Sequence, residues 1–211
     1  MTTIAFLLYD GMTALDFVGP HEVLARLPGA TAVLASPRGG TIRTDLGLLV
    51  GPTMAVSEVG VPDVVIVPGG PETLSIEWDR ATLDWLRRTA SGGGRTCSVC
   101  TGAFVLGAAG LLRGRRATTH WALTGALPSF GATVAPDRVC IDGNVITAAG
   151  VSAGIDMALV LAAHLTDEAT AEALQLCVEY DPQPPFASGG LDTASDATVR
   201  TALEILTGTT S

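Results

Sequence analysis

Two cysteines three positions apart, Cys97 and Cys100, are the side chains of this sequence best suited to covalent chemistry. The second lies in Ser98-Val99-Cys100-Thr101-Gly102, where a β-like run ends in a nucleophile-type residue with small residues two positions to either side. Small flanking residues suit a sharp strand-to-helix turn, because the backbone there passes close to its neighbours. The turn would place the Cys100 sulfur at a helix N-terminus, which favours thiolate over thiol. Cys100 is therefore the candidate nucleophile; the alternative is a buried structural cysteine.

The spacing of Cys97 and Cys100 also allows a zinc site or a redox pair. Structural zinc needs about four ligands, and the sequence shows neither a second C-x-x-C nor a His pair with finger spacing. Redox motifs usually place both cysteines at the start of a helix, whereas Cys97 falls inside the expected strand. We interpret Cys97 as a core residue, and we expect no bound metal.

Two glycines follow another buried run, at Pro68-Gly69-Gly70. Parallel strands share one carboxyl edge, so Gly69 and Gly70 are expected near Cys100. Their backbone N–H groups could stabilise a developing negative charge, which is the role of an oxyanion hole. The alternative is an ordinary turn after a strand.

Two further side chains are candidates for proton transfer. Asp16 lies in the apolar segment Ala14-Leu15-Asp16-Phe17-Val18-Gly19-Pro20. It suits either the N-cap of a helix or a carboxyl group whose pKa is raised by apolar surroundings until it can donate a proton near neutral pH. His120, in Ala117-Thr118-Thr119-His120-Trp121, is a possible partner for Cys100; the alternative is a histidine held by backbone near a helix start.

Short β-like runs alternate with helix-like stretches along the chain. This order is typical of an α/β fold, a doubly wound and mostly parallel sheet with helices on both faces, and it predicts a flavodoxin-like three-layer sandwich in one domain over residues 1–211. The expected strands are 3–9, 32–35, 63–67 and 95–99, with an excursion or hairpin over 41–50 and a hairpin over 139–147. The expected helices are 15–27, 82–90, 101–109, 121–130, 153–165, 168–179 and 197–206.

Composition excludes several classes of protein. The formal net charge is −9, and a protein without a basic run cannot neutralise phosphates, so nucleic acid is not an expected partner. The sequence holds no apolar run of the ~18 residues that a membrane-spanning helix needs, and the expected first strand has no basic region before it, which argues against a signal peptide. Four cysteines in a chain of 211 residues are too few for a disulfide scaffold, so we expect a reducing, cytoplasmic location.

The motifs at Pro68-Gly69-Gly70, Ser98–Gly102 and Ala117–Trp121 together resemble the ThiJ/PfpI superfamily, which has a class I glutamine-amidotransferase-like fold. Within it, Leu15–Pro20, Gly154–Asp156 and Glu179-Tyr180-Asp181-Pro182-Gln183-Pro184-Pro185-Phe186 resemble the isonitrile hydratase (isocyanide hydratase) family. The resemblance runs from about residue 4 to 195, and its proline-rich segment discriminates best, because the superfamily shares the cysteine elbow.

This resemblance implies hydration of an isonitrile to an N-substituted formamide, in a homodimer, without metal or cofactor. Cys100 matches the nucleophile and Asp16 the acid/base residue, and Thr101 follows the nucleophile as expected; it is not the His of protease-like members. An isonitrile carbon accepts both a nucleophile and a proton. Cys100 would add to that carbon while Asp16 protonates it, and water would then hydrolyse the thioimidate. Backbone N–H groups near Gly70 and Thr101 would position the reacting groups.

Two other functions remain open. A glyoxalase or deglycase acts on α-oxoaldehydes, also through a thiolate, but those relatives typically pair the cysteine with Glu, whereas this chain offers Asp16. A ligand-sensing module related to helix-turn-helix regulators would share the elbow. Only 25 residues follow Phe186, too few for an attached pair of DNA-binding helices.

Overall fold

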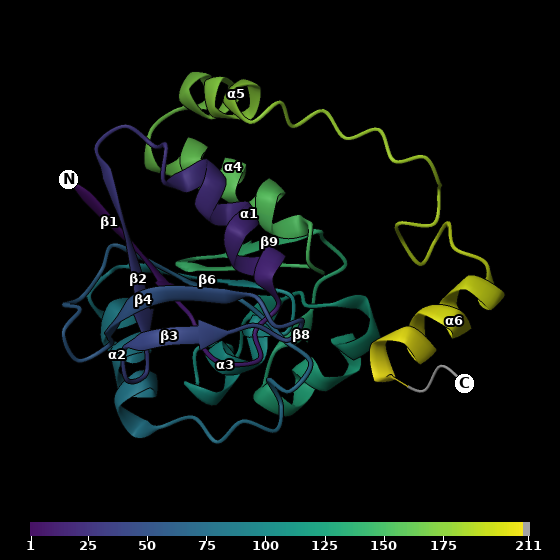
Figure 1. The fold of residues 1–211 in the computed structure, drawn as a ribbon, viewed down its shortest axis with the longest axis horizontal. Helices are drawn as coiled ribbons and strands as arrows, with labels where there is room; N and C mark the ends of the chain where they lie inside the picture. Colours follow the sequence, from purple (N-terminus) through teal and green to yellow (C-terminus); the bar gives the residue numbers. More distant parts are fainter. Residues whose placement is uncertain (209–211) are drawn as a thin grey trace. The chain divides into compact units, whose positions relative to one another are not determined.

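The computed structural model describes residues 1–208. They divide into two compact units, Met1–Val178 and a second unit that begins at Glu179. Within the first unit, eight strands form one sheet in the order β3-β4-β2-β1-β5-β6-β10-β9 (Figure 1). Their bounds are β1 Thr2–Leu7, β2 Ala30–Ser36, β3 Gly40–Arg43, β4 Leu49–Ala55, β5 Val64–Val67, β6 Arg95–Val99, β9 Val139–Asp142 and β10 Val145–Ala148.

The sheet is parallel from β4 to β10 and antiparallel only at its two ends, where β3 pairs with β4 and β9 with β10. Its five parallel central strands, β2-β1-β5-β6-β10, have the 2-1-3-4-5 order of flavodoxin-like folds. The expected doubly wound fold is therefore confirmed. In this order the strand sequence reverses between β1 and β5, and such folds bind ligands outside the carboxyl ends of the strands at that reversal.

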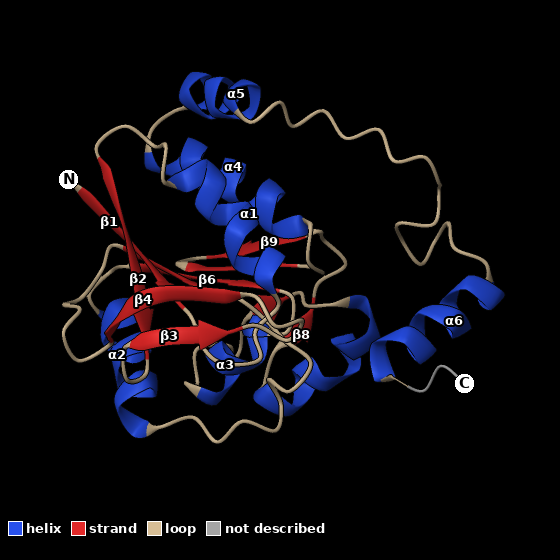
Figure 2. Cartoon of the chain, viewed as in Figure 1, coloured by secondary structure: helices blue, strands red, loops and turns tan. Residues whose placement is uncertain are grey.

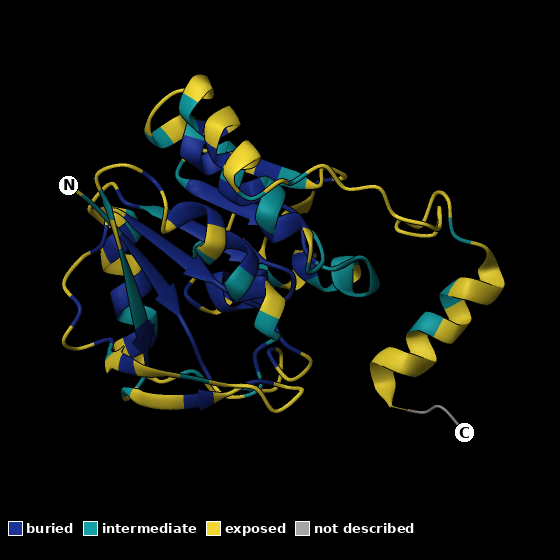
Figure 3. Ribbon diagram, turned by 45° about the horizontal axis from the view of Figure 1, so that its top comes forward, coloured by how far each residue is buried: buried dark blue, intermediate teal, exposed yellow. Residues whose placement is uncertain are grey.

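Helices cover both faces of the sheet, and each face has its own apolar core (Figures 2 and 3). One core joins the sheet to α1 (Ala14–Leu24), α4 (Ala153–Leu165) and α5 (Glu168–Cys177); the other joins it to α2 (Arg80–Ser91) and α3 (Gly102–Ala108). The alternation of side chains along each strand divides them between the two cores. In β1, Ile4 and Phe6 belong to the first core, and Ala5 and Leu7 to the second.

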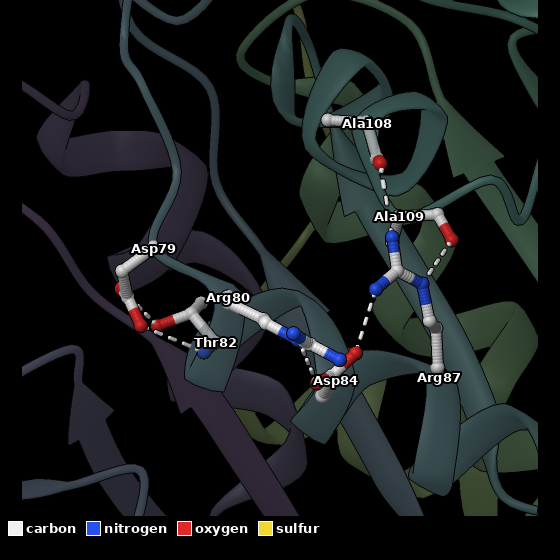
Figure 4. Close-up of polar contacts among 7 residues, drawn as sticks. All are labelled: Asp79, Arg80, Thr82, Asp84, Arg87, Ala108 and Ala109. Carbon is white, nitrogen blue, oxygen red and sulfur yellow. Dashed lines mark hydrogen bonds and ion pairs between the residues drawn. The ribbon is translucent and has the colours of Figure 1, made fainter.

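Polar contacts at both ends of α2 fix the connection between β5 and β6 (Figure 4). The Asp79 carboxylate caps the helix, accepting from the Thr82 N–H at 2.9 Å and from the Thr82 hydroxyl at 2.7 Å. Further along, the Arg87 guanidinium donates to the Ala109 carbonyl at 2.9 Å, beside an ion pair with Asp84 at 2.7 Å. Because Ala109 is the C-cap of α3, this arginine ties α2 to the helix that follows Cys100.

Most of the elements expected from the sequence are present, and the differences have local causes. Strand β6 and helix α4 have the predicted bounds. The segment Trp121–Phe130 is helical as expected, but it is the 3₁₀ helix η1 with Pro128 inside it, and proline disfavours an α-helical ladder. The short parallel pair β7 (Arg116–Ala117) and β8 (Thr133–Val134) was not predicted, because two-residue strands leave no periodic pattern to detect.

The second unit holds the helix α6 (Asp196–Thr207), and no residue in the described part, 179–208, is buried. Ser195 caps α6 by accepting from the Thr198 N–H, and Gly208 ends it in a left-handed conformation. The expectation of one domain over 1–211 stays a prediction. Within residues 1–208, no helix is long and apolar enough to cross a membrane.

Candidate active site

Three loops meet at the carboxyl ends of the central strands, where the strand order reverses. Strand β1 continues into the loop before α1, β5 continues into Pro68-Gly69-Gly70, and β6 continues directly into Cys100. These loops are linked by bonds such as that from the Thr13 N–H to the Gly69 carbonyl, at 2.8 Å. The sheet therefore brings the loop segments predicted for the site to one edge.

Cys100 occupies the sharp turn that its flanking residues predict. Its φ is +56°, a left-handed conformation that costs a non-glycine residue about 1–3 kcal/mol. Its N–H lies 3.1 Å from the Ala148 carbonyl and 2.9 Å from that of Ala149, and its own carbonyl accepts from the Thr119 hydroxyl at 2.7 Å. A Cβ on Gly102 would collide with the Val67 carbonyl. Backbone contacts on every side thus hold the strained turn in place.

Asp16 lies inside the first turn of α1 and is completely buried. It does not cap the helix: its Oδ2 reaches across to accept the Gly69 N–H at 2.8 Å. Its Oδ1 has no partner with hydrogen-bond geometry among residues 1–208. Burial raises the pKa of this carboxyl from 3.8 to about 7, although the Gly69 amide and the Cys100 thiol both act to lower it. The carboxyl can therefore exchange a proton near neutral pH.

The Cys100 sulfur and the Asp16 carboxyl influence one another directly. Burial, and secondly the negative charge of Asp16, raise the pKa of the Cys100 thiol to about 12. Hydrogen bonds from the Thr101 amide, the Val151 amide and the Thr101 hydroxyl act in the opposite direction. Near neutral pH the resting pair therefore keeps its proton on sulfur beside a carboxyl group that is partly ionised, and the helix start alone does not produce a resting thiolate.

The Gly69 and Gly70 amides both donate hydrogen bonds within the site. Gly69 N–H donates to Asp16, and Gly70 N–H donates to the Thr101 hydroxyl oxygen at 2.8 Å. Both donors are already engaged, and the expected oxyanion role of these amides stays a prediction. A Cβ on Gly69 would lie 2.5 Å from both the nitrogen and the hydroxyl oxygen of Thr101. The glycines let this loop approach the elbow closely enough to position Asp16 and Thr101.

Comparison with known proteins agrees with this arrangement. Residues 2–164 match the DJ-1/PfpI family. The chain belongs to the DJ-1/PfpI family. It is 46% identical, over 93% of its length and 86% of the relative's, to an isonitrile hydratase of Pseudomonas putida. A ThiJ/PfpI family protein from Pseudomonas syringae has a crystal structure that superposes with a TM-score of 0.90 at 40% identity, covering 99% of this chain and 86% of that one.

Regulatory proteins also share this DJ-1/PfpI fold. The chain is 33% identical to the HTH-type transcriptional regulator CdhR of Pseudomonas aeruginosa, over 84% of this chain and 53% of the regulator. Family membership alone therefore does not decide between catalysis and ligand sensing, and the side chains of the site must do so.

His120 and Cys97 are both held by contacts that do not involve the Cys100 sulfur. His120 is half-buried at the start of η1, where its Nδ1 accepts from the Ala122 N–H at 3.3 Å, and burial lowers the pKa of its ring. Its ring also fills the space beside Gly150. This is the structural alternative for that histidine. Cys97 is fully buried in β6, and burial raises the pKa of its thiol to about 12. Among residues 1–208, no cluster of His, Cys, Asp and Glu side chains could hold a metal ion.

Sequence reasoning missed four residues of the site: Tyr9, Thr73, Thr119 and Val151. Thr119 bonds the Cys100 carbonyl, and the Val151 amide contacts its sulfur. Tyr9 and Thr73 are buried in one hydrogen-bonded group with Thr101. Two of these residues had a signal in the sequence. Thr119 lies in the Ala117–Trp121 motif that carries the family resemblance, and Tyr9 lies at the carboxyl end of the expected first strand. Thr73 and Val151 carry no such signal, since only the folded loops bring them to the elbow.

Proposed function

We propose that this protein hydrates isonitriles to N-substituted formamides through a covalent thioimidate on Cys100. The observation that carries the proposal is the pair formed by Cys100 and a fully buried Asp16 whose carboxyl has a pKa of about 7. An isonitrile carbon must gain both a nucleophile and a proton, and this pair supplies both from adjacent groups. The likeness to the Pseudomonas putida isonitrile hydratase supports the same substrate class.

In the first step, ionised Asp16 accepts the thiol proton as the Cys100 sulfur bonds to the isonitrile carbon. Asp16 then delivers that proton to the same carbon. The product is a thioimidate, R–N=CH–S–Cys100, whose mass equals that of enzyme plus substrate, and the carboxylate is regenerated. Because the pKa of the resting thiol is about 12, the thiolate forms only as this transfer takes place.

In the second step, water adds to the thioimidate carbon. Asp16 takes a proton from the water and passes it to nitrogen, which gives a tetrahedral R–NH–CH(OH)–S–Cys100. The carbon–sulfur bond then breaks, its electron pair leaves with sulfur, and the hydroxyl proton returns to sulfur by way of Asp16. The released product is R–NH–CHO, so one water is consumed and the Cys100–Asp16 pair is restored.

The decisive experiment compares purified enzyme on alkyl and aryl isonitriles with the same enzyme on methylglyoxal. Formamide that takes its formyl oxygen from ¹⁸O-labelled water supports the proposal. A clear rate on methylglyoxal with no formamide would favour the glyoxalase or deglycase function. Binding of isonitriles without turnover of either substrate would favour a ligand-sensing module.

The thioimidate is tested by intact-protein mass spectrometry of a slowed variant. Asp16→Glu keeps a carboxyl group but displaces it, so the proton transfers of both steps should slow, and the thioimidate accumulates if its hydrolysis becomes the slower step. An adduct equal to the mass of the substrate is expected, and Cys100→Ser serves as the control without the thiol. Formamide production with no adduct in any slowed variant would contradict the covalent route.

We further propose that the enzyme is a cytoplasmic homodimer that uses no metal. Leu203 and Leu206 lie three residues apart on α6 and are both exposed. Residues at this spacing share one face of a helix, which would offer a second chain an apolar contact surface. Activity that survives dialysis against a chelator would support the metal-free mechanism. Loss of activity restored only by added metal would contradict it.

A further inference from the structure

Three buried hydroxyl groups form a connected network beside the nucleophile. The Tyr9 hydroxyl donates to the Pro68 carbonyl at 2.8 Å and lies 3.1 Å from the Thr73 hydroxyl oxygen. The Thr73 hydroxyl in turn lies 3.0 Å from that of Thr101. All three residues are at most 4% exposed, so the hydroxyl protons must find their acceptors within the protein.

The Gly70 carbonyl is the point where these protons compete. It accepts from the Thr73 hydroxyl at 2.7 Å and from the Thr101 hydroxyl at 2.8 Å, while the Thr73 amide reaches it at 3.3 Å. The oxygen of the Thr101 hydroxyl is itself held by the Gly70 N–H at 2.8 Å. The hydroxyl oxygen of Thr101 is therefore held in place. Only the direction of its O–H bond, and so the acceptor of its proton, can change.

Thr101 follows Cys100 directly in the elbow, so the Cys100 sulfur is a second candidate acceptor for that proton. In agreement with this, the Thr101 hydroxyl is one of the groups that act to lower the pKa of the thiol. A hydroxyl group donates one proton, so Thr101 cannot make a full hydrogen bond to the Gly70 carbonyl and to a thiolate at the same time. If Thr101 turns to sulfur, a buried carbonyl loses a short hydrogen bond, which is unfavourable unless another donor remains. The Thr73 hydroxyl, at 2.7 Å, is the shorter of the two donors that then remain; the other is the Thr73 amide at 3.3 Å, which is too long to replace it fully.

We propose that Thr73 is a positioning residue for the reaction: its hydroxyl keeps the Gly70 carbonyl hydrogen-bonded, which leaves the Thr101 hydroxyl proton free to turn to the Cys100 sulfur as negative charge develops there. The proposal deepens the proposed function, because it concerns the same nucleophile. It does not depend on the isonitrile substrate, because any reaction of the Cys100 thiolate should respond in the same way.

The test measures alkylation of Cys100 by iodoacetamide between pH 7 and pH 10, with mass spectrometry to separate Cys100 from the exposed Cys177. Below the pKa of a thiol, the alkylation rate follows the thiolate fraction, so loss of one charge-assisted hydrogen bond should slow Thr73→Val about 3- to 10-fold at each pH. Thr73→Ser keeps the hydroxyl and should alkylate within about twofold of wild type. On an isonitrile, Thr73→Val should lower kcat more than it changes KM.

Tyr9→Phe is the matched control, because it removes a buried hydroxyl from the same network but neither hydroxyl donor of the Gly70 carbonyl. It should lose stability and still alkylate at the wild-type rate. In a Thr101→Val background, Thr73→Val should not slow alkylation further, because the Thr101 hydroxyl proton through which Thr73 acts is already absent. Wild-type alkylation in Thr73→Val, equal slowing in Tyr9→Phe, or an undiminished effect in the Thr101→Val background would each overturn the proposal.

If Thr73→Val does not fold, NMR of the wild-type protein provides the second measurement. A slowly exchanging Thr73 hydroxyl proton with close contacts to Gly70 supports the proposal. A Thr73 hydroxyl proton that points to Tyr9 instead would overturn it. Neither alkylation nor NMR needs turnover. If no formamide were found, the proposed function would fail, but these two measurements would still decide the role of Thr73.

Discussion

Replacing Asp16 by Asn should make the protein more stable at alkaline pH while it removes the proton transfer. The carboxyl is completely buried, and its pKa rises from 3.8 to about 7 on folding. The folded protein therefore holds the Asp16 proton more tightly than the unfolded chain does. Stability from this group is full below pH 3.8 and falls as the pH rises through about 7.

The shift gives the size of the effect. A pKa difference of about 3 units corresponds to about 4 kcal/mol, at 1.36 kcal/mol for each unit. Part of this loss is already present at pH 5, because the unfolded chain has ionised by then. Between pH 5 and pH 8 the free energy of unfolding of wild type should fall by about 2.5 kcal/mol relative to that of Asp16→Asn.

Urea unfolding of both proteins at pH 5, 6, 7 and 8 measures this difference directly, because all other titrating groups are common to the pair. Asp192→Asn makes the same chemical change at an exposed position and should keep the wild-type slope. Curves for wild type and Asp16→Asn that stay parallel within about 0.5 kcal/mol from pH 5 to pH 8 would refute the raised pKa. Without a raised pKa, Asp16 would stay ionised near neutral pH and could not donate the proton that the proposed mechanism requires.

The other predictions concern the nucleophile, the pH profile, the loop and the assembly. Cys100→Ala should abolish turnover in a folded protein while Cys97→Ala largely preserves it, which steady-state kinetics and circular dichroism check together. The kcat/KM of wild type should rise with pH through about 7, because protonated Asp16 cannot accept the thiol proton; a flat profile from pH 5 to pH 8 would contradict this. Gly69→Ala should cost about 2 kcal/mol or more by denaturant unfolding, and most of the activity, since its Cβ would meet Thr101 at 2.5 Å. Light scattering over a dilution series should show a dimer, and a monomer at micromolar concentration would count against the homodimer.

The elements that the sequence predicted well are those with one dominant local signal. Strand β6, an apolar run that ends at the elbow, and helix α4, a long apolar-faced helix, have their expected bounds. The sharp turn at Cys100 was predicted for the same reason, because small residues lie two positions to either side of it. Asp16 had two local explanations of equal weight, a cap or a buried acid. Its bond to Gly69 from a different loop argues against the cap, and its role as acid/base stays a prediction.

The parts that sequence reasoning missed depend on contacts between loops far apart in the chain. Thr73 follows Gly70 by three residues, and nothing in its neighbourhood marks it; its importance comes from Thr101, 28 residues away. The amides of Gly69 and Gly70 looked like oxyanion donors because an unpaired N–H at a strand end is usually available. Whether a donor is already engaged depends on side chains that arrive from other loops, and local pattern cannot show that.

The site is assembled from features that each lower stability. An ionised Asp16 costs about 4 kcal/mol at alkaline pH, and the left-handed turn at Cys100 adds about 1–3. Together they are comparable with the whole free energy of unfolding of an ordinary domain, about 5–15 kcal/mol. The two apolar cores on the faces of the sheet must offset this cost. Hydrogen bonds from backbone and side chains also hold the loops that carry the site. Burial is the largest cause of the raised pKa of Asp16, so the proton exchange that we propose and the loss of stability at alkaline pH have the same physical origin.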